Sequence, residues 1–385
     1  MKPYDVYSIF DIEIVKASGI TLWDKNGHAY LDLYGGHAVI SIGHGHPDYI
    51  AAIGNQLEKI GFYSNSVKIN LQDELAEKLG EMSGYPDYDI FLCNSGAEAN
   101  ENAFKLASFY NGRKKIIAFN NSFHGRTSLA VAATDNQGIA APVNKTEHVC
   151  FLPLNDCELL EKTMDESVCA VIVEGIQGVA GVNIPSAPFL KQIENLCHKY
   201  GAIMILDEVQ SGYGRSGKFF AHQWADVKPH LITVAKGMGN GFPVAGILIC
   251  PQLPAKKEML GTTFGGNYLA CAAAISVLDV IKKEDLISNA LRMGDYLTSS
   301  LQTVPGIKEI RGVGLMTGIE FDEPCSEIRK ELLFRHSVFT GSSSNKNTIR
   351  ILPSLTITKA GIDMFVTALK SSLVSKKNEI LYNSK

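Results

Sequence analysis

The chain has 385 residues, of which 45% are hydrophobic, and 36 Lys and Arg against 40 Asp and Glu give a formal net charge of -4. A chain of this length buries a large core and commonly divides into two domains. No basic surplus is left for phosphate backbones, so the composition argues against nucleic-acid binding.

Neither end of the chain nor its interior carries a membrane signal. The start, MKPYDVYSIFDIEIVKASG, contains acids and lacks the apolar run of a signal peptide. No later stretch offers about 18 uncharged apolar residues for a membrane span. The eight cysteines are scattered without a CxxC pair, so we expect reduced core residues and no zinc site. These features predict a cytosolic protein.

The predicted elements begin with a hairpin in WDKNGHAYLDL, within the first fifty residues. From about Asp89 to Cys250, short β-branched runs alternate with helical patterns, the spacing of βαβ crossovers around a parallel sheet. The runs are DIFLC, KIIAF, VCFLPL, CAVIVE, AIMILDE, LITVA and VAGILIC. We therefore expect an α/β domain with a buried sheet.

The helix predicted after Asn94-Ser95 has one face that should pack on this sheet: Ala99, Ala103, Leu106 and Tyr110. The last ninety residues mix helices with short strands around RGVGLMTGIEF and NTIRILPSLTIT. We place both termini in a second, smaller α+β domain. The predicted boundaries are 1–50 and 291–385 for the two parts of the small domain, and 51–290 for the large one.

Candidate chemistry lies at the carboxyl ends of the predicted strands, where open parallel sheets bind ligands. Four ends are polar: the turn Ser95-Gly96-Ala97, and the residues Glu174, Asp207 and Lys236. Each alone is more commonly a solvated loop residue. A turn at a helix start suits a phosphate, a lysine can be an amine nucleophile, and an acid can keep a ring nitrogen protonated. Together they indicate a site for pyridoxal phosphate.

Three other motifs could indicate a dinucleotide, a nucleotide triphosphate or a metal, but each fits its expected pattern less well. The glycines of 237–239 lack the third glycine of a dinucleotide fingerprint. GYGRSGK at 212–218 fits the first seven positions of a P-loop, but Phe219 stands where a Ser or Thr would hold magnesium. His44 and His46 have no convergent third ligand, and before Pro a turn into a helix is the better interpretation. We expect no metal.

Nine segments closely resemble the class III aminotransferases, which are fold type I pyridoxal phosphate enzymes, and within them the acetylornithine aminotransferase group. They are LWDKNGHAYLDLYGGHAVISIGHGHP, FLCNSGAEANENAFKLA, FHGRT, VIVEGIQG, ILDEVQSGYGRSGKFFAHQ, TVAKGMGNGFPVAGIL, TTFGGNYLACAAA, RGVGLMTGIE and IRILPSLTIT. The resemblance covers nearly the whole chain. It implies a large domain with a mostly parallel seven-stranded sheet and a smaller α+β domain built from both termini.

The resemblance also implies cofactor contacts. Lys236 would bind the cofactor covalently and then move the substrate proton, and Asp207 would pair with the pyridine nitrogen. Gln210 would lie near the ring hydroxyl and Glu174 beside the ring. The remaining implied contacts are Ser95, Gly96 and Ala97 for the phosphate, Phe123 stacked on the ring with His124 adjacent, and Thr263 reaching the phosphate of the other subunit. Thr263 thus implies a homodimer with shared active sites.

For substrates, Arg126 is implied to bind the α-carboxylate of an ornithine-type amine and Arg350 that of glutamate. Tyr7 would border the pocket. Three residues depart from the family pattern: Gly175 and Tyr268 each replace a proline, and Val179 replaces the second glutamate of VEPIQGEGG. The missing glutamate is the important departure, because in relatives it can neutralise the arginine equivalent to Arg350.

The implied reaction moves the terminal amine of an N-acylornithine, acetyl or succinyl, to 2-oxoglutarate in arginine biosynthesis. Ornithine, 4-aminobutyrate or a lysine-pathway amine remains an alternative donor. An aminomutase of the glutamate semialdehyde type shares the fold and the lysine, but it needs no external keto acid. A non-catalytic binding protein is disfavoured because the lysine, the aspartate and the phosphate turn are all present.

Overall fold

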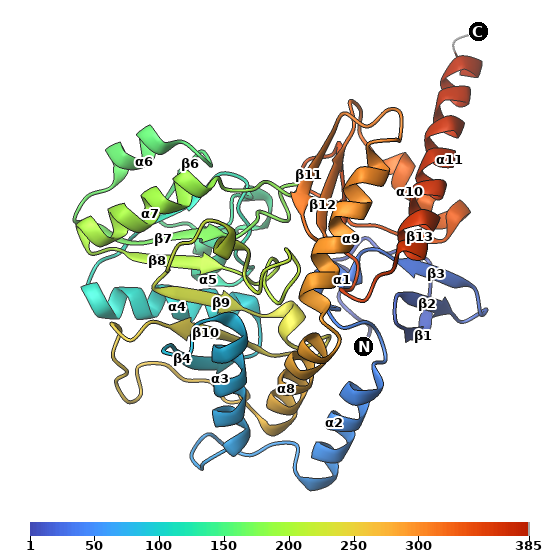
Figure 1. Ribbon diagram of the computed structural model, residues 1–385. Helices are drawn as coiled ribbons and strands as arrows, with labels where there is room; N and C mark the ends of the chain where they lie inside the picture. The colour runs from blue at the N-terminus through green and yellow to red at the C-terminus, as the bar shows by residue number, and fades with distance from the viewer. Residues whose placement is uncertain (384–385) are drawn as a thin grey trace.

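The computed structural model describes residues 1–383. The chain forms two lobes (Figure 1). The larger lobe is built around a seven-stranded sheet, and the smaller one holds two sheets of four and three strands together with both chain ends.

The seven-stranded sheet contains every apolar run that the sequence singles out. Its strands are β4 (Asp89–Cys93), β5 (Lys115–Phe119), β6 (Val149–Leu152), β7 (Val168–Glu174), β8 (Ile203–Asp207), β9 (Leu231–Val234) and β10 (Ala245–Ile249), in the order β4-β10-β9-β8-β7-β5-β6. Strand β10 is antiparallel to both neighbours, and the other pairings are parallel. The predicted α/β fold with a mostly parallel sheet is confirmed.

Helices cover both faces of this sheet. Successive residues of a strand point to opposite faces, and in β7 Ile172 packs with α4 (Gly96–Asn111) while Val173 packs with α7 (Ala187–Tyr200). Every residue of β7 is buried, which explains why its sequence is continuously apolar rather than alternating. The remaining helices of this lobe are α3 (Asn70–Ser83), α5 (Ser128–Ala132), α6 (Cys157–Thr163) and α8 (Tyr268–Lys283).

Helix α4 begins and ends at the residues its sequence indicates. The side chain of Ser95 caps it by accepting from the backbone N–H of Glu98 at 3.3 Å, and Gly112 ends it in the left-handed conformation. The predicted face is buried at three of its four positions. Tyr110, in the last turn, is 52% exposed, so the face that packs on the sheet ends one turn earlier than the periodicity predicts.

The smaller lobe joins segments from both parts of the sequence. The predicted hairpin forms β2 (Thr21–Asp24) and β3 (Ala29–Asp32), and β3 pairs in parallel with β13 (Val338–Phe339). Further elements are β1 (Ile14–Ser18), α1 (Gly35–Ala38), α9 (Leu286–Leu301), β11 (Glu309–Val313), β12 (Met316–Glu320), α10 (Ser326–His336), β14 (Thr348–Ile351) and α11 (Lys359–Asn383). Helix α2 (Pro47–Lys59) instead packs against α8 of the larger lobe. The domain boundaries at residues 50 and 290 stay a prediction.

The two histidines of GHGHP shape the entry to α2. His46 accepts from the backbone N–H of Asp48 at 3.2 Å and caps the helix, and His44 Nε2 lies 2.9 Å from Asp32 Oδ2. The turn into a helix is as predicted. Within residues 1–383, no helix is both long and apolar enough to cross a membrane.

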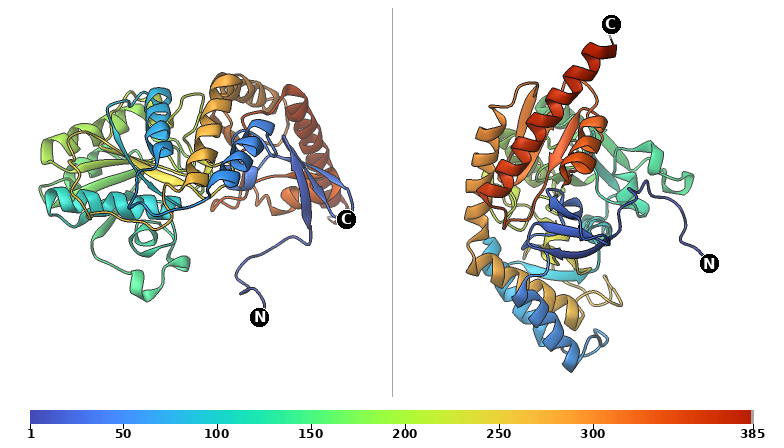
Figure 2. Two further views of the ribbon diagram at one scale, coloured as in Figure 1. Left: turned by 90° about the horizontal axis from the view of Figure 1, so that it is seen from below. Right: turned by 90° about the vertical axis from the view of Figure 1, so that its right-hand side faces the viewer.

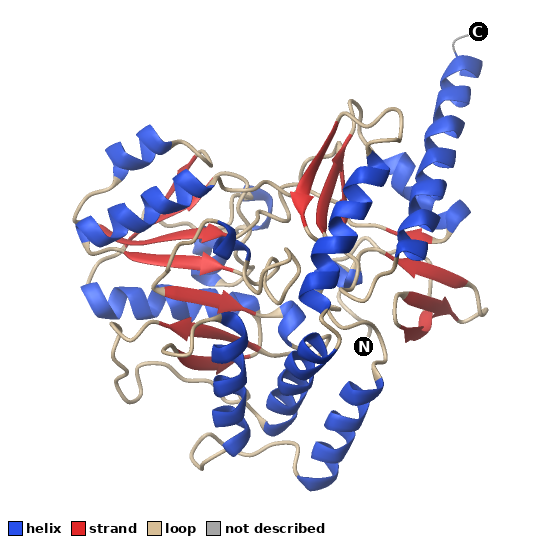
Figure 3. Ribbon diagram, viewed as in Figure 1, coloured by secondary structure: helices blue, strands red, loops and turns tan. Residues whose placement is uncertain are grey.

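The carboxyl ends of the parallel strands point toward the smaller lobe. Figure 3 shows the arrows of β7, β8 and β9 ending at the loops between the two lobes. The polar residues that follow these strands therefore meet where the lobes face each other, at the edge where such sheets bind ligands.

Candidate active site

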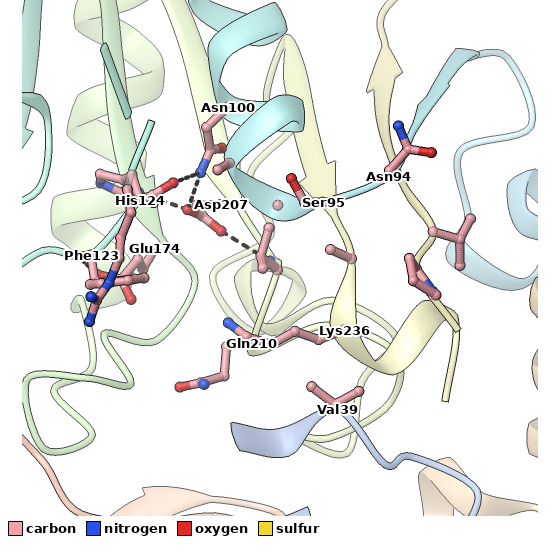
Figure 4. Close-up of a pocket in the computed structure, with 18 of the residues that line it drawn as sticks. Val39, Asn94, Ser95, Asn100, Phe123, His124, Glu174, Asp207, Gln210 and Lys236 are labelled. Carbon is pink, nitrogen blue, oxygen red and sulfur yellow. Dashed lines mark hydrogen bonds and ion pairs between the residues drawn. The ribbon is translucent and has the colours of Figure 1, made fainter. Parts of the chain in front are cut away.

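A cavity of about 430 Å³ lies at this edge of the sheet. It is large enough for a small cofactor together with part of a substrate. Ten of the predicted site residues line it: Ser95, Gly96, Ala97, Phe123, His124, Arg126, Glu174, Asp207, Gln210 and Lys236. Figure 4 shows several of them converging on the same space from separate strands and loops.

Asp207, the last residue of β8, is held from two sides and is 4% exposed. Its Oδ2 accepts from His124 Nδ1 at 2.7 Å and from Asn100 Nδ2 at 2.8 Å, and its Oδ1 accepts from the backbone N–H of Val209 at 3.0 Å. Because donors reach both oxygens, the carboxylate has a fixed orientation before any ligand arrives.

Asn100 is a site residue that the sequence reasoning missed. Its amide also donates to the carbonyl of His124 at 2.7 Å and accepts from Thr233 Oγ1 at 2.8 Å, so it ties α4 to the ends of β8 and β9. The sequence does contain one indication of its role: Asn100 follows Ala99 on the face of α4 that was predicted to be buried and apolar. A buried amide in such a place needs polar partners.

Glu174 ends β7, and backbone groups from two loops hold it. Phe123 N–H donates to its Oε1 at 3.0 Å, and Gly178 N–H donates to its Oε2 at 3.3 Å. Burial raises the pKa of this carboxyl to about 7; the neighbouring Asp207 also raises it, while His124 opposes the shift. Glu174 therefore holds a proton well above the pH at which an exposed glutamate loses one.

Lys236 follows β9 by two residues, at the start of a short 3-10 turn and with a φ of 45°. Burial lowers the pKa of its ammonium, an effect opposed by Asp207 and Glu174 and supported by Arg350 and Arg215. A lowered pKa increases the fraction of neutral amine, which is the nucleophilic form.

The turn at the start of α4 presents backbone N–H groups to the cavity through Gly96 and Ala97. The first N–H groups of a helix have no partner within it, and they carry the positive end of its dipole. Val209 packs so closely over this turn that a Cβ on Gly96 would lie 2.7 Å from Val209 Cγ1. A glycine is therefore required here, and the turn suits a phosphate.

Gln210 connects the two lobes. Its Nε2 donates to the carbonyl of His37 at 3.0 Å, and its Oε1 accepts from Arg350 Nη1 at 3.2 Å. A Cβ on Gly178 would lie 1.8 Å from Gln210 Oε1, so the amide rests directly on this glycine. Arg350 is 3% exposed, and burial lowers the pKa of its guanidinium.

The other predicted residues lie further out. Arg126 is exposed at the cavity, and Thr263 is exposed and outside its lining. Tyr7 is 75% exposed, in a segment before β1 that runs away from the body of the chain (Figure 2). The roles of these three residues stay predictions.

These features fit pyridoxal phosphate. Lys236 supplies an amine of lowered pKa, Asp207 a fixed carboxylate, and the start of α4 an anion site. His124 Nε2 is buried without a hydrogen-bond partner in the described part of the chain, as expected where a ligand completes a site. The fold and the site define a fold type I pyridoxal phosphate enzyme.

Comparison with known proteins identifies the family. The model of the class III aminotransferases matches residues 4–373. An acetylornithine aminotransferase from Bacillus subtilis (strain 168) is 40% identical over 379 residues, which cover 96% of this chain and 97% of that protein. The chain belongs to the class III aminotransferases, which depend on pyridoxal phosphate.

Solved structures agree with this assignment. The ornithine aminotransferase from Toxoplasma gondii ME49 superimposes with a TM-score of 0.91 at 30% identity, covering 98% of this chain and 93% of that one. Another structure of the Toxoplasma enzyme has pyridoxal phosphate at partial occupancy in its active site.

Proposed function

We propose that this enzyme transfers the terminal amine of an N-acylornithine to 2-oxoglutarate, in arginine biosynthesis in the cytoplasm. The observation that carries the proposal is the similarity, over nearly the full length of both chains, to an acetylornithine aminotransferase. The cavity supports it, because a lysine, an acid and a phosphate-binding turn converge there.

Bound pyridoxal phosphate supplies an aldehyde that takes up the amine and a protonated ring that draws electrons from the substrate carbon. In this proposal Lys236 Nζ binds the cofactor and carries the proton to and from the substrate carbon, with its lowered pKa keeping the amine available. Asp207 keeps the ring nitrogen protonated, oriented by His124 and Asn100. Glu174 and Phe123, joined by the hydrogen bond from the Phe123 N–H to Glu174 Oε1, would border the ring.

In this proposal the two arginines bind different substrate carboxylates. Arg126, exposed at the cavity, binds the α-carboxylate of the acylornithine, and Arg350, buried behind Gln210, binds a carboxylate of 2-oxoglutarate or glutamate. Arginine suits both roles because its planar fork matches a carboxylate with two hydrogen bonds. Tyr7 approaches the pocket only if the N-terminal segment folds over it.

We propose further that the enzyme is a homodimer whose subunits complete each other's sites. Helix α2 has no buried residue, and large apolar side chains are exposed along and after it: Ile50, Leu57, Ile60, Phe62 and Tyr63. The Phe62 ring packs at 5.3 Å from that of exposed Phe264, next to Thr263. An apolar surface of this kind is typical of an interface between subunits. It supports Thr263 as the residue that reaches the partner's phosphate.

A donor and acceptor screen tests the reaction. We expect acylornithines to be used in preference to ornithine, 4-aminobutyrate and lysine-pathway amines, with strict dependence on 2-oxoglutarate. Free ornithine is the competing donor with specific support, since an ornithine aminotransferase has closely similar structure. A higher kcat/KM for ornithine would contradict the acylornithine assignment, and turnover without a keto acid would indicate an aminomutase.

A further inference from the structure

Arg126 lies in a loop whose backbone is fixed on its N-terminal side. The backbone N–H of Phe123 donates to Glu174 Oε1 at 3.0 Å, and the carbonyl of His124 accepts from Asn100 Nδ2 at 2.7 Å. Both loop residues line the cavity (Figure 4). Because these partners are themselves part of a hydrogen-bonded network, the backbone that leads into Arg126 has little freedom to move.

Gly125, directly before Arg126, lies between α4 and α5. Its φ is 141°, and a Cβ on it would lie 2.8 Å from the Cβ of Ala97 and 3.1 Å from that of Ala130. A side chain at this position would push the loop away from α4, so the close approach requires glycine. Ala97 belongs to the turn that suits the phosphate. The loop that carries Arg126 is therefore packed directly against that turn.

On the C-terminal side of Arg126, the loop is held by Glu101. The hydroxyl of Thr127 donates to Glu101 Oε1 at 2.9 Å, and the backbone N–H of Ala130 donates to the same oxygen at 2.8 Å. This N–H belongs to the first turn of α5, which the side chain of the N-cap residue commonly caps. Thr127 is the N-cap residue and makes no such bond. Glu101 therefore caps α5 from another helix.

The guanidinium of Arg126 is free to bind a ligand. It is exposed and lines the cavity. Among the described side chains, those of residues 1–374, none forms a hydrogen bond or an ion pair with it. A cation on a backbone that is fixed on both sides loses little freedom when a carboxylate binds, so the affinity is higher than on a mobile loop.

We propose that Glu101 is a positioning residue: through its two hydrogen bonds it fixes the place at which Arg126 meets the α-carboxylate of the amine donor. The inference rests on the proposed acylornithine function. Helix α4 carries the phosphate-binding turn at its start and Glu101 in its second turn. One helix thus sets the distance between the cofactor, where the amine reacts, and the group that holds the other end of the donor. Reaction requires both ends to be held in register.

The test compares two donors that differ only in the α-carboxylate. N-acetylornithine carries it, and N-acetylputrescine is the same amine without it, so the ratio of their kcat/KM values measures what the carboxylate contributes. In the holoenzyme, Arg126→Ala should bring this ratio to near one. Glu101→Ala should lower it by about tenfold, because a guanidinium displaced by about 1 Å no longer matches the carboxylate. N-acetylnorvaline, which lacks the reacting amine, should also bind more weakly to Glu101→Ala by titration calorimetry.

Matched variants separate positioning from general support of the fold. Glu101→Gln keeps an oxygen that can accept both hydrogen bonds, so it should keep most of the ratio. Asn102→Ala, on the same helix, should leave the ratio unchanged, since its amide contacts only the helix backbone at Glu98. In an enzyme that already carries Arg126→Ala, adding Glu101→Ala should lower the ratio no further, because the two residues act as a unit.

The outcomes distinguish the inference from the proposed function. If Glu101→Ala leaves the ratio unchanged, or lowers kcat/KM equally for the two donors, Glu101 does not position Arg126. A ratio that Arg126→Ala leaves unchanged would also overturn the inference, because the carboxylate would then be bound elsewhere. If the wild-type enzyme does not use N-acetylornithine at all, the proposed function is wrong and the inference falls with it.

Discussion

His124 Nδ1 lies 2.7 Å from Asp207 Oδ2, and the two side chains are almost completely buried. Asn100 donates to the same oxygen at 2.8 Å. The carboxylate that we assign to the cofactor ring is therefore oriented by two side chains, one from α4 and one from the loop after β5. Both residues lie in segments that carry the sequence resemblance, but a site role was predicted only for His124.

The first prediction concerns Asn100. Asn100→Ala should lower kcat/KM by about tenfold to hundredfold, because it removes buried hydrogen bonds to Asp207, His124 and Thr233. A matched control is Asn102→Ala on the same helix, whose amide contacts only the helix backbone at Glu98. Steady-state kinetics and cofactor titration measure the effect. Equal behaviour of the two variants would show that Asn100 does not position the site.

Lys236→Ala should fold and retain the cofactor through non-covalent contacts, since the turn at the start of α4 and Asp207 remain. It should lose turnover, because no other amine lines the cavity in the described part of the chain. The cofactor's absorbance spectrum reports the loss of its covalent bond to the protein. Turnover above the uncatalysed background would remove Lys236 from the proposed role.

The large lobe was predictable because its signals are local. Each strand of the sheet is a continuous apolar run, and Ser95 and Gly112 mark the ends of α4. The contacts between lobes were not predictable. Gln210 is 140 residues from Arg350 and 173 residues from His37 in the sequence. No local sequence pattern indicates that the side-chain amide of Gln210 hydrogen-bonds to both residues.

Gly178→Ala tests that shared amide. The new Cβ would lie 1.8 Å from Gln210 Oε1, so Gln210 must leave Arg350 and His37. We expect a loss of about 1 to 3 kcal/mol in stability from overpacking, and weaker binding of 2-oxoglutarate. The double variant Gly178→Ala/Gln210→Ala removes the clash with Gln210 and leaves the new Cβ 2.8 Å from Met316 Cε, the end of a flexible side chain. It should therefore recover most of the stability but not the affinity. Thermal unfolding and the KM for 2-oxoglutarate separate the two effects.

The proposed dimer gives a prediction about cofactor affinity. Gel filtration should show two chains per particle, and Thr263→Ala should weaken cofactor binding without dissociating them, because only the contact to the partner's phosphate is lost. Leu57→Glu, on exposed α2, should instead favour the monomer, since burying an unpaired charge at an interface is costly. A monomer with full activity would contradict the shared site.

Glu174 predicts a dependence of stability on pH in the cofactor-free enzyme. Its pKa is about 7 in the folded chain, against 4.5 for an ordinary exposed glutamate. Between these values the folded state holds a proton that the unfolded state has lost, so this group makes stability fall as pH rises, by about 1.4 kcal/mol per pH unit. The glutamine of Glu174→Gln does not titrate, so the stability of this variant does not fall with pH for this reason. The Tm of the variant relative to the wild type should therefore be higher at pH 8 than at pH 5, whereas the same difference at both pH values would show that burial does not raise this pKa.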